Sequence, residues 1–174
     1  MKKQIDSSTA IAPVLADGAP VFLDAKRLRL LIDAATDAPR KRSHLLLHSG
    51  PEDSVQRLVI AAQPHTYVRP HHHTRQWEML VLHRGSMEVL IFREDGEVVS
   101  RNRLDPANPV VQIPVGAWHT CVVREPDTVV VEIKPGPFRP NEFCQWAPEE
   151  GGAEVGEFLD WIASAEPGQK WRVS

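Results

Sequence analysis

The sequence predicts a mainly β domain, built as a sandwich or barrel, with one helix before the strands and one after them. Between residues 44 and 138 about eight short segments with strand-like patterns follow one another. Gly, Pro and Asp residues at the ends of these segments predict turns. Segments with helical spacing of apolar residues lie on either side of this region. At 174 residues, the chain is expected to form one domain, over 21–174.

The first 20 residues are expected to stand apart from this domain. Residues 1–20 are polar with interspersed Ala and Pro, which predicts either a poorly ordered extension or an added edge strand. After them, Asp24 is a typical helix N-cap. The apolar residues of one helical face then follow at Leu28, Leu31, Ile32 and Ala35. The segment Pro39–Arg42 is expected to end this helix.

The strands of the predicted barrel core come from about 44–138. Each is an apolar run or an alternating pattern bounded by turn residues. Asp95 and Gly96 form a dipeptide typical of a hairpin turn, and several prolines mark other turns. The expected strands are Leu45–His48, Gln56–Ala62, Trp77–His83, Ser86–Arg93, Glu97–Leu104, Val110–Ile113, Thr120–Val123 and Thr128–Lys134.

A C-terminal helix is expected over Val155–Ala165. Phe158, Leu159 and Ile162 lie on one face of such a helix, and Gly168 follows its end. The barrel core is therefore expected to carry an N-terminal and a C-terminal helix.

Composition and charge argue against several classes of partner. The net charge is −3, which gives no reason to expect nucleic acid or an anionic membrane surface as a partner. No apolar run approaches the roughly 18 residues of a membrane span, and Met1–Asp6 lack the apolar segment of a signal peptide. The two cysteines, Cys121 and Cys144, are too few for a disulfide scaffold. We expect a cytoplasmic protein with reduced thiols and no membrane partner.

Three histidines and a glutamate have the spacing of metal ligands on strands. Side chains two apart on a strand point to one face, so His71 and His73 can aim at one point while His72 points away. His119 follows a Pro-Val-Gly-Ala turn and opens another strand. His-x-His alone is a weak signal, but its combination with Glu78 and a separate histidine box is typical of a metal site.

Glu78 needs a turn before it in order to share this site. It lies five residues after His73, so strict alternation would place it on the opposite face, and a turn at Thr74–Gln76 must reset the phase. Glu78 is also the one charge in the apolar run Trp77–Leu82, where a buried carboxylate without a partner is costly. A divalent cation is one such partner. Three imidazoles and a carboxylate suit Fe(II), Mn(II), Ni(II), Cu(II) or Zn(II).

The two histidine boxes resemble those of the cupin superfamily. In that superfamily the first box has His-x-His followed by Glu and Gly, and the second has Pro-x-Gly-x-x-His. The matching positions of this chain are His71, His73, Glu78, Gly85, Pro114, Gly116 and His119. Three turn or strand positions depart from the family's Gly, Gly and Asn, namely His65, Asn108 and Val123. The resemblance implies a double-stranded β-helix, or jelly-roll barrel, with all four metal-ligand positions intact.

A narrower resemblance is to the WbuC family of cupin-fold metalloproteins. It covers about 22–165, and the segments that carry it lie largely outside the cupin boxes. They are Pro39–Arg42, Leu46–His48, Val55–Leu58, Tyr67–His71, Trp77–Glu78, Glu132–Phe138 and Trp146–Glu150. The family is associated with bacterial surface-polysaccharide (O-antigen, lipopolysaccharide) gene clusters. The resemblance therefore implies a sugar-derived substrate, without naming a reaction.

Three polar residues are candidates for proton transfer, namely Glu132, Lys134 and His48. Glu132 and Lys134 share a face of the apolar strand Thr128–Lys134, so they either lie in the mouth of the barrel or form an ion pair on an exposed face. His48 is either a group beside the metal or the substrate, or an ordinary surface histidine.

Arg69 and Tyr67 are the candidate substrate contacts. Arg69 has the parity of His71 and His73, so it is expected to face the site, where its guanidinium can bind a carboxylate or phosphate. The alternative for Arg69 is a pair with a surface acid. Cys121 either lines the pocket or fills the core as a small apolar residue.

These residues predict a metalloenzyme that acts on a small or sugar-derived substrate. With one divalent metal as Lewis acid and a proton-transfer residue, the expected chemistry is isomerisation, epimerisation or elimination. With Fe(II), the same ligands would instead permit dioxygenation. A non-catalytic sugar- or ligand-binding protein is the alternative of a different class. A homodimer is compatible with the sequence, because Met79 and Val81, opposite Glu78 in parity, need cover either from the helices or from a second subunit.

Overall fold

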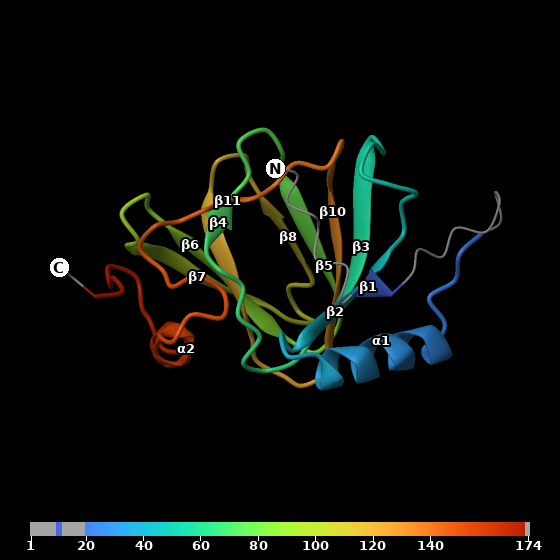
Figure 1. Ribbon diagram of the computed structural model, residues 1–174, viewed down its shortest axis with the longest axis horizontal. Helices are drawn as coiled ribbons and strands as arrows, with labels where there is room; N and C mark the ends of the chain where they lie inside the picture. The colour runs from blue at the N-terminus through green and yellow to red at the C-terminus, as the bar shows by residue number, and fades with distance from the viewer. Residues whose placement is uncertain (1–9, 12–19, 173–174) are drawn as a thin grey trace.

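The computed structural model describes residues 10–11 and 20–172, which form two facing β-sheets and two helices (Figure 1). Among these residues, neither helix is long and apolar enough to cross a membrane. In chain order the elements are β1 (Ala10–Ile11), α1 (Ala25–Asp37), β2 (Arg42–Leu46), β3 (Val55–Ala62), β4 (His71–His72), β5 (Glu78–Arg84), β6 (Met87–Phe92), β7 (Val98–Leu104), β8 (Val110–Ile113), β9 (Trp118–Val123), β10 (Thr128–Pro135), β11 (Glu142–Phe143) and α2 (Val155–Ile162).

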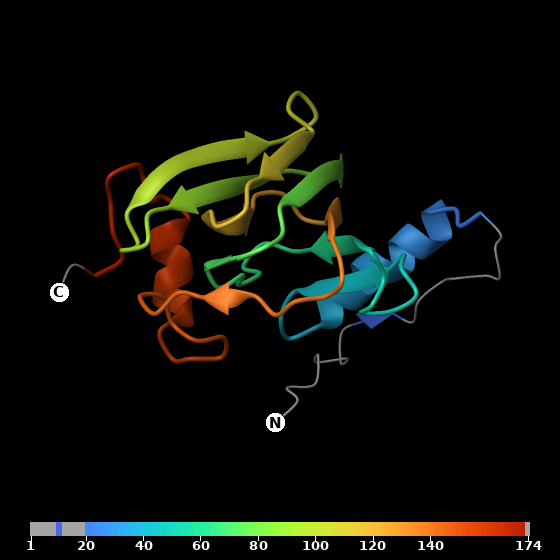
Figure 2. The ribbon, with the colours of Figure 1, turned by 90° about the horizontal axis from the view of Figure 1, so that it is seen from above.

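The strand order is that of a jelly roll, as predicted. One sheet has six strands in the order β1-β2-β3-β10-β5-β8, and the other has five in the order β11-β4-β9-β6-β7. Apart from the β6–β7 hairpin, each connection between β3 and β10 crosses from one sheet to the other, which is the double-stranded β-helix of cupins and related folds. In Figure 2 the β6–β7 hairpin lies on the opposite side of the molecule from β2 and β3.

The closed barrel that the sequence suggested is not formed. β7 is the last strand of the five-stranded sheet and β8 the last of the six-stranded sheet, and each has a hydrogen-bonded neighbour on one side. The short turn between them, held by mutual backbone hydrogen bonds of Asp105 and Asn108, carries the chain across without pairing the two strands. The molecule is therefore an open sandwich at this edge.

Helix α1 covers the outer face of the six-stranded sheet. Asp24 caps the helix by accepting a hydrogen bond from the Arg27 amide at 2.8 Å, as the sequence predicted. The buried residues Leu31 and Ile32 pack against the sheet, where Val59 is fully buried. The helix ends at Asp37, just before the predicted stop at Pro39–Arg42.

Helix α2 covers the outer face of the five-stranded sheet, at the lower left of Figure 1. Its buried residues, Phe158 and Ile162, pack on strands β6 and β7. Two guanidinium groups bind its C-terminal carbonyls: Arg101 donates to Ile162 O at 2.9 Å, and Arg124 donates to Ala163 O at 2.6 Å. The helix is shorter than the predicted Val155–Ala165, because the chain turns after Ile162.

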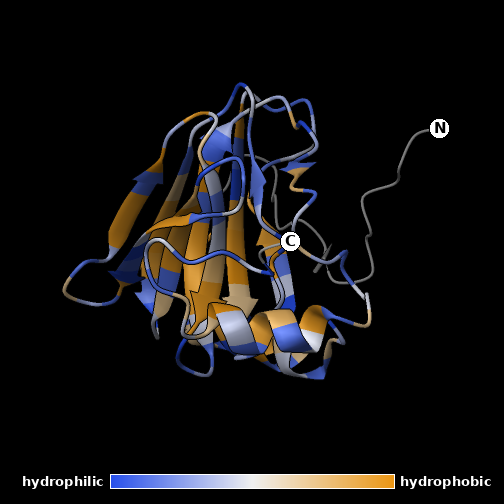
Figure 3. Ribbon diagram, turned by 90° about the vertical axis from the view of Figure 1, so that its left-hand side faces the viewer, coloured by the Kyte–Doolittle hydropathy of each residue, from blue (hydrophilic) through white to orange (hydrophobic). Residues whose placement is uncertain are grey.

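The inner faces of the two sheets form an apolar core with a polar end. Leu80, Met87, Val89 and Val130 are among the buried residues between the sheets. Figure 3 shows that hydrophobic residues follow the strands, whereas the loops at the strand ends are mainly hydrophilic. Successive residues of each strand thus point in turn to the inner and the outer face of its sheet, which is the alternation that predicted the strands.

Several strand bounds differ from those predicted, and two short strands, β4 and β11, were missed. β2 begins at Arg42 instead of Leu45, because Arg42 pairs with Ala62 of β3. The two-residue strands β4 and β11 exist only through pairing with each other and, for β4, with β9. β1 adds a parallel edge strand next to β2, and the remainder of the predicted N-terminal extension lies outside the described residues.

Replacing Asp24 tests how much the N-cap of α1 contributes to the stability of the domain. We expect Asp24→Ala to lower the free energy of unfolding by about 1 kcal/mol, because the Arg27 amide loses its acceptor. Asp33→Ala is the matched control on the same helix, since Asp33 makes only an exposed pair with Arg29, and a change within about 0.5 kcal/mol is expected. Urea unfolding of both variants measures the difference, and equal values would contradict the capping role.

Candidate metal centre

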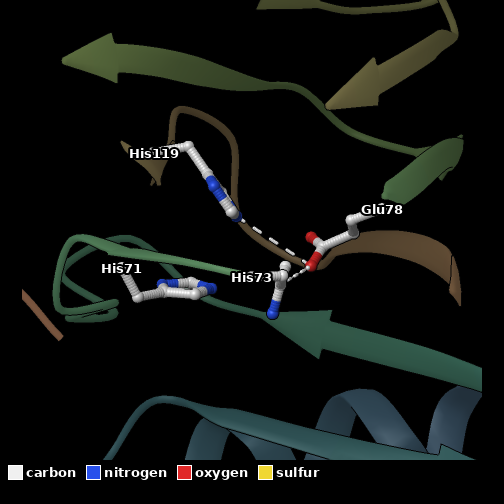
Figure 4. Close-up of side chains that lie close together, drawn as sticks. All are labelled: His71, His73, Glu78 and His119. Atoms are coloured by element: carbon white, nitrogen blue, oxygen red, sulfur yellow. Dashed lines mark hydrogen bonds and ion pairs between the residues drawn. The ribbon is translucent and has the colours of Figure 1, made fainter. Parts of the chain in front are cut away.

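Four residues from two sheets meet at the polar end of the core. His71 is in β4 and pairs directly with His119 in β9, so both side chains leave neighbouring strands of the five-stranded sheet. His73 follows β4, and Glu78 opens β5 in the six-stranded sheet. One ligand atom from each of the four lies within 4.8 Å of the others. Figure 4 shows the four side chains pointing toward a common space.

The chain changes the direction of its side chains between His73 and Glu78 in the predicted turn, so that both residues face the same side. Residues 74–77 leave the strand geometry, and Gln76 anchors them: its side chain is buried and donates to the carbonyls of Pro135 and, at 3.1 Å, Pro137. The Gly116 amide donates to His73 O at 2.9 Å, which ties the second histidine box to the first. Glu78 therefore begins β5 facing inward.

Two of the imidazoles are oriented by backbone carbonyls. His71 Nδ1 lies 3.0 Å from Arg69 O, and His119 Nδ1 lies 2.9 Å from Ala117 O. When Nδ1–H donates to a carbonyl, Nε2 is left with its lone pair, which is the arrangement found for metal-binding histidines. His119 Nε2 is buried and has no hydrogen-bond partner among the described residues. This nitrogen has a free lone pair and faces the Glu78 carboxylate, so a cation bound between them would satisfy both groups.

The electrostatics favour the metal-binding protonation states of His71, His119 and Glu78. Burial, and then the neighbouring His119, lower the pKa of His71 to about 3. Burial also lowers the pKa of His119. For Glu78 burial acts in the opposite direction, but the His73 hydrogen bond at 2.7 Å and the nearby His119 and Lys134 outweigh it, and its pKa falls to about 2. Neutral imidazoles and an ionised carboxylate are the forms that bind metals.

The donor set fits one divalent transition metal. Three imidazole nitrogens and one carboxylate oxygen, each 7% exposed or less at the residue level, form a small buried cluster. Such a set accepts Fe, Mn, Ni, Zn or Cu, and the order of affinities does not single one out. His72, the middle histidine, is outside the cluster: its ring lies 4.1 Å from that of Trp118, and its Nε2 is 3.3 Å from Glu142.

Glu132 and Lys134 lie beside the cluster on the inner face of β10. They form a buried ion pair, with Lys134 Nζ 2.7 Å from Glu132 Oε1. Glu132 pairs with Leu80 across the strands, and the next inward position, Lys134, is level with Glu78. Burial and the nearby Glu78 raise the pKa of Glu132. Burial lowers the pKa of Lys134, but the attraction of Glu132 and Glu78 outweighs it, so the ammonium stays charged.

The other predicted site residues lie elsewhere. His48 follows β2, and its Nδ1 is 2.9 Å from both the amide nitrogen and the carbonyl oxygen of Arg57. Tyr67 is buried beneath α2, where its ring meets Phe158 and its hydroxyl donates to Pro148 O at 2.6 Å. These contacts do not bring either residue to the four-residue cluster, and their catalytic and substrate-binding roles stay predictions.

Arg69 turns toward the C-terminal segment. Its guanidinium donates to Cys144 O at 2.7 Å and lies 5.6 Å from the ring of Phe143, which in turn packs on His71. Its nearest acid is Glu149 at 3.6 Å. Residues 66–70 are not in a strand, so the shared parity with His71 does not set its direction. Its role as a substrate contact also stays a prediction.

Comparison with protein families gives a partial match. A family model described as a domain of unknown function (DUF6016) matches residues 23–104. This is less than half of the chain, and it includes His71, His73 and Glu78 but not His119. No curated protein matches the chain.

Solved structures similar to this chain include proteins of the cupin superfamily. A cupin-2 domain protein from Rhodospirillum rubrum is 15% identical, covering 71% of this chain and 80% of that one, with a TM-score of 0.48. L-ribose isomerase from Cellulomonas parahominis is 15% identical, with 59% and 68% covered and a TM-score of 0.49. KdgF from Halomonas sp. is 20% identical, with 59% and 85% covered and a TM-score of 0.47.

The fold assignment rests on the strand order of the two sheets and not on these similarities. In two longer matched proteins, CapF from Staphylococcus aureus and an oxalate decarboxylase from Lactobacillus farciminis, this chain spans 27% of the length. The narrower resemblance to the WbuC family stays a prediction.

Proposed function

We propose that the protein is a metal-dependent enzyme that moves a proton on a small oxygen-bearing substrate. The observation that carries this proposal is the buried Glu132–Lys134 pair on the inner face of β10, level with the ligand Glu78. A charged pair costs free energy when buried, and it is retained most readily where its charges are used. A divalent cation held by the four ligands would act as a Lewis acid toward a carbonyl or hydroxyl oxygen.

The roles of this pair follow from its charges. The Glu132 carboxylate accepts a proton from the carbon next to the polarised carbonyl group and returns it at the same or a neighbouring carbon. Lys134 remains an ammonium, and it balances the charge of Glu132 and holds that carboxylate in place at 2.7 Å. Proton removal and return of this kind serve isomerisation or epimerisation, whereas in an elimination the bond to a leaving oxygen on the neighbouring carbon breaks and that oxygen takes the proton.

The sequence supports a substrate class, a location and an oligomeric state for this enzyme. The resemblance to the WbuC family supports a sugar-derived substrate in bacterial surface-polysaccharide metabolism, and a cytoplasmic location is part of the same proposal. A homodimer is part of the same proposal, because Met79 and Val81 are only half-buried on the outer side of β5.

The direct test combines metal analysis with a proton-exchange assay. Protein purified without chelator is expected to contain one divalent transition-metal ion per chain. A panel of sugars and nucleotide-sugars is then incubated with it in D2O, and NMR detects deuterium incorporation at carbon. Oxygen consumption without exchange would instead support an Fe(II)-dependent dioxygenase. Binding without either reaction would support a non-catalytic ligand-binding protein.

Replacing the proposed proton carrier separates catalysis from metal binding. We expect Glu132→Gln to retain its metal and to lower the exchange rate by about 10²- to 10⁴-fold, the usual contribution of a general acid or base. Glu52→Gln is the control, because Glu52 is an exposed carboxylate away from the core, and it should exchange at the unmodified rate. Full activity of Glu132→Gln would remove Glu132 from the mechanism.

A further inference from the structure

One large aromatic side chain next to the metal ligands is half exposed. Phe143 in β11 pairs directly with His71 in β4, at the edge of the five-stranded sheet (Figure 1). Residues opposite each other in an antiparallel pair project from the same face of a sheet. Phe143 therefore shares the inner face with His71, and the centroids of the two rings lie 5.9 Å apart. Phe143 is nevertheless 48% exposed, whereas His71 is 7% exposed.

The side of the metal cluster that faces β8 is filled by the core instead. Ile113 of β8 pairs with the ligand Glu78, and Leu80 follows Glu78 on the same face of β5. Both apolar side chains are buried. A ligand that approaches on the β11 side, in contrast, contacts the exposed ring of Phe143 next to the ligand His71.

A cationic side chain lies over the ring of Phe143. The guanidinium carbon of Arg69 is 5.6 Å from the ring centroid, and the carbonyl oxygen of Arg69 is 3.0 Å from His71 Nδ1. Arg69 Nη2 donates to Cys144 O at 2.7 Å, but Nε is buried without a hydrogen-bond partner among the described residues. Nη1 is 3.6 Å from Glu149, whose side chain is 85% exposed, so this pair contributes little. Arg69 therefore has charge and hydrogen-bonding capacity left for a ligand.

Other cations of this region are already bound to carboxylates. Arg40 makes two hydrogen bonds of 2.6 Å to the carboxylate of Glu150. Lys134 lies 2.7 Å from Glu132 on the inner face of β10. The looser contact of Arg69 distinguishes it from these two, because no carboxylate among the described residues lies within hydrogen-bonding distance of its guanidinium.

We propose that Phe143 and Arg69 form the recognition surface for the substrate, and that this substrate is a sugar-like molecule that carries a carboxylate or a phosphate. This inference rests on the proposed function and names the substrate class for the same site. The apolar face of the sugar ring packs on the exposed ring of Phe143, which removes apolar surface from water. The guanidinium of Arg69 binds the anionic oxygens through charge-assisted hydrogen bonds. Both contacts are next to His71, so they place the carbon skeleton beside the metal ligands.

Fluorine NMR of the full chain tests the contact with Phe143 directly. All five phenylalanines are replaced by 4-fluorophenylalanine during expression, and the variant Phe143→Leu identifies the resonance of Phe143. D-glucuronate, glucose 6-phosphate, D-glucose and inorganic phosphate are then titrated separately. At least one of the two anionic sugars is expected to shift the Phe143 resonance. Phe22, 71% exposed and located before α1, is the internal control whose resonance should stay in place.

The four probes separate the anionic group from the ring. Glucose is expected to bind about 10- to 100-fold more weakly than the better anionic sugar, because it lacks the group that Arg69 binds. The anionic sugar that binds more tightly tells whether a carboxylate or a phosphate is preferred. Inorganic phosphate offers no ring, so it is expected to bind more weakly than that sugar. If glucose binds as tightly as both anionic sugars, or if no sugar shifts the Phe143 resonance, the inference is wrong.

A change at Arg69 tests the same contact from the protein side. Arg69→Gln is expected to weaken binding of the anionic sugar by about 10- to 100-fold and to leave the affinity for glucose unchanged. Arg93→Gln is the matched control, since Arg93 is 65% exposed and paired with Glu97 on the β6–β7 turn, and it should bind like the unmodified protein. An unchanged affinity of Arg69→Gln for the anionic sugars would overturn the inference. If Arg69→Gln does not fold, the comparison of anionic and neutral sugars on the unmodified protein decides.

Titrations with and without metal separate this inference from the proposed function. They are run on chelator-treated protein and on protein loaded with Zn(II), and the dependence on Arg69 is expected in both. If the protein binds no metal, the proposed function fails, whereas the shift of the Phe143 resonance still decides where anionic sugars bind. If the protein binds metal and exchanges protons on a substrate, but no sugar shifts that resonance, the proposed function holds and this inference is wrong.

Discussion

His119→Ala is expected to lower the affinity for divalent metal by at least about 100-fold, since loss of an outer-shell partner alone costs about 10- to 100-fold. His119 supplies a buried Nε2 without a protein partner among the described residues, held in place by the hydrogen bond between Nδ1 and Ala117 O. Its removal leaves two imidazoles and one carboxylate, one donor fewer than the intact cluster offers to a divalent transition metal. Competition with a chromogenic chelator, using Zn(II) and Mn(II), measures the change.

His72→Ala is the matched control for this experiment. It removes the same side chain between the two ligands His71 and His73, but the His72 ring lies against Trp118, and its Nε2 faces Glu142. Metal affinity is therefore expected to stay at the unmodified value. Equal losses in His119→Ala and His72→Ala would mean that the metal is bound by a general histidine cluster and not by the four-residue site.

Three of the four residues of the metal cluster could be predicted from local patterns in the sequence. Strand alternation selects His71 and His73 over His72, and the apolar run after Trp77 makes the single charge of Glu78 conspicuous. The pairing of His71 with His119 joins strands far apart in sequence, which alternation alone does not predict. His119 was joined to the other three because it stands in a separate histidine box, and the resemblance of the two boxes to the cupin pattern implied the same set.

Parity arguments failed to place residues outside regular strands. Arg69 and Tyr67 lie in the stretch 66–70, which has no strand partner, so their side chains do not alternate with His71. Their directions are set instead by the C-terminal segment, through Cys144 O and Pro148 O. Such long-range partners leave no periodic pattern in the sequence.

The open edge of the sandwich also had no signal in the sequence. β7 and β8 were both predicted nearly as observed, but closure depends on whether two edge strands lie within hydrogen-bonding reach. Their connection is a tight turn closed by Asp105 and Asn108, and it leaves a cavity between the strands. Side-chain patterns predict which face of a strand is buried much better than they predict which strand will pair with an edge strand.

Phe158→Ala is expected to lower the free energy of unfolding by about 3–5 kcal/mol, the usual cost of emptying a buried aromatic position. Phe158 is fully buried, and its ring lies between those of Tyr67, Trp161 and Trp171 at centroid distances of 5.4–5.7 Å. The loss should come from this core alone, because the metal cluster lies between the two sheets, whereas Phe158 lies on the outer face of the five-stranded sheet. Metal affinity at temperatures where the variant is folded is therefore expected to be unchanged.

Phe22→Ala makes the same chemical change on the surface, where Phe22 is 71% exposed, and is expected to shift the free energy of unfolding by no more than about 0.5 kcal/mol. Guanidinium chloride unfolding, followed by tryptophan fluorescence, compares the two variants, since Trp161 and Trp171 report on the core around Phe158. A loss below about 1 kcal/mol in Phe158→Ala would show that α2 is held mainly by Arg101 and Arg124 at its C-terminal carbonyls. A large loss in both variants would instead point to an effect on the unfolded chain, because Phe22 is not part of the core cluster that contains Phe158 in the described residues.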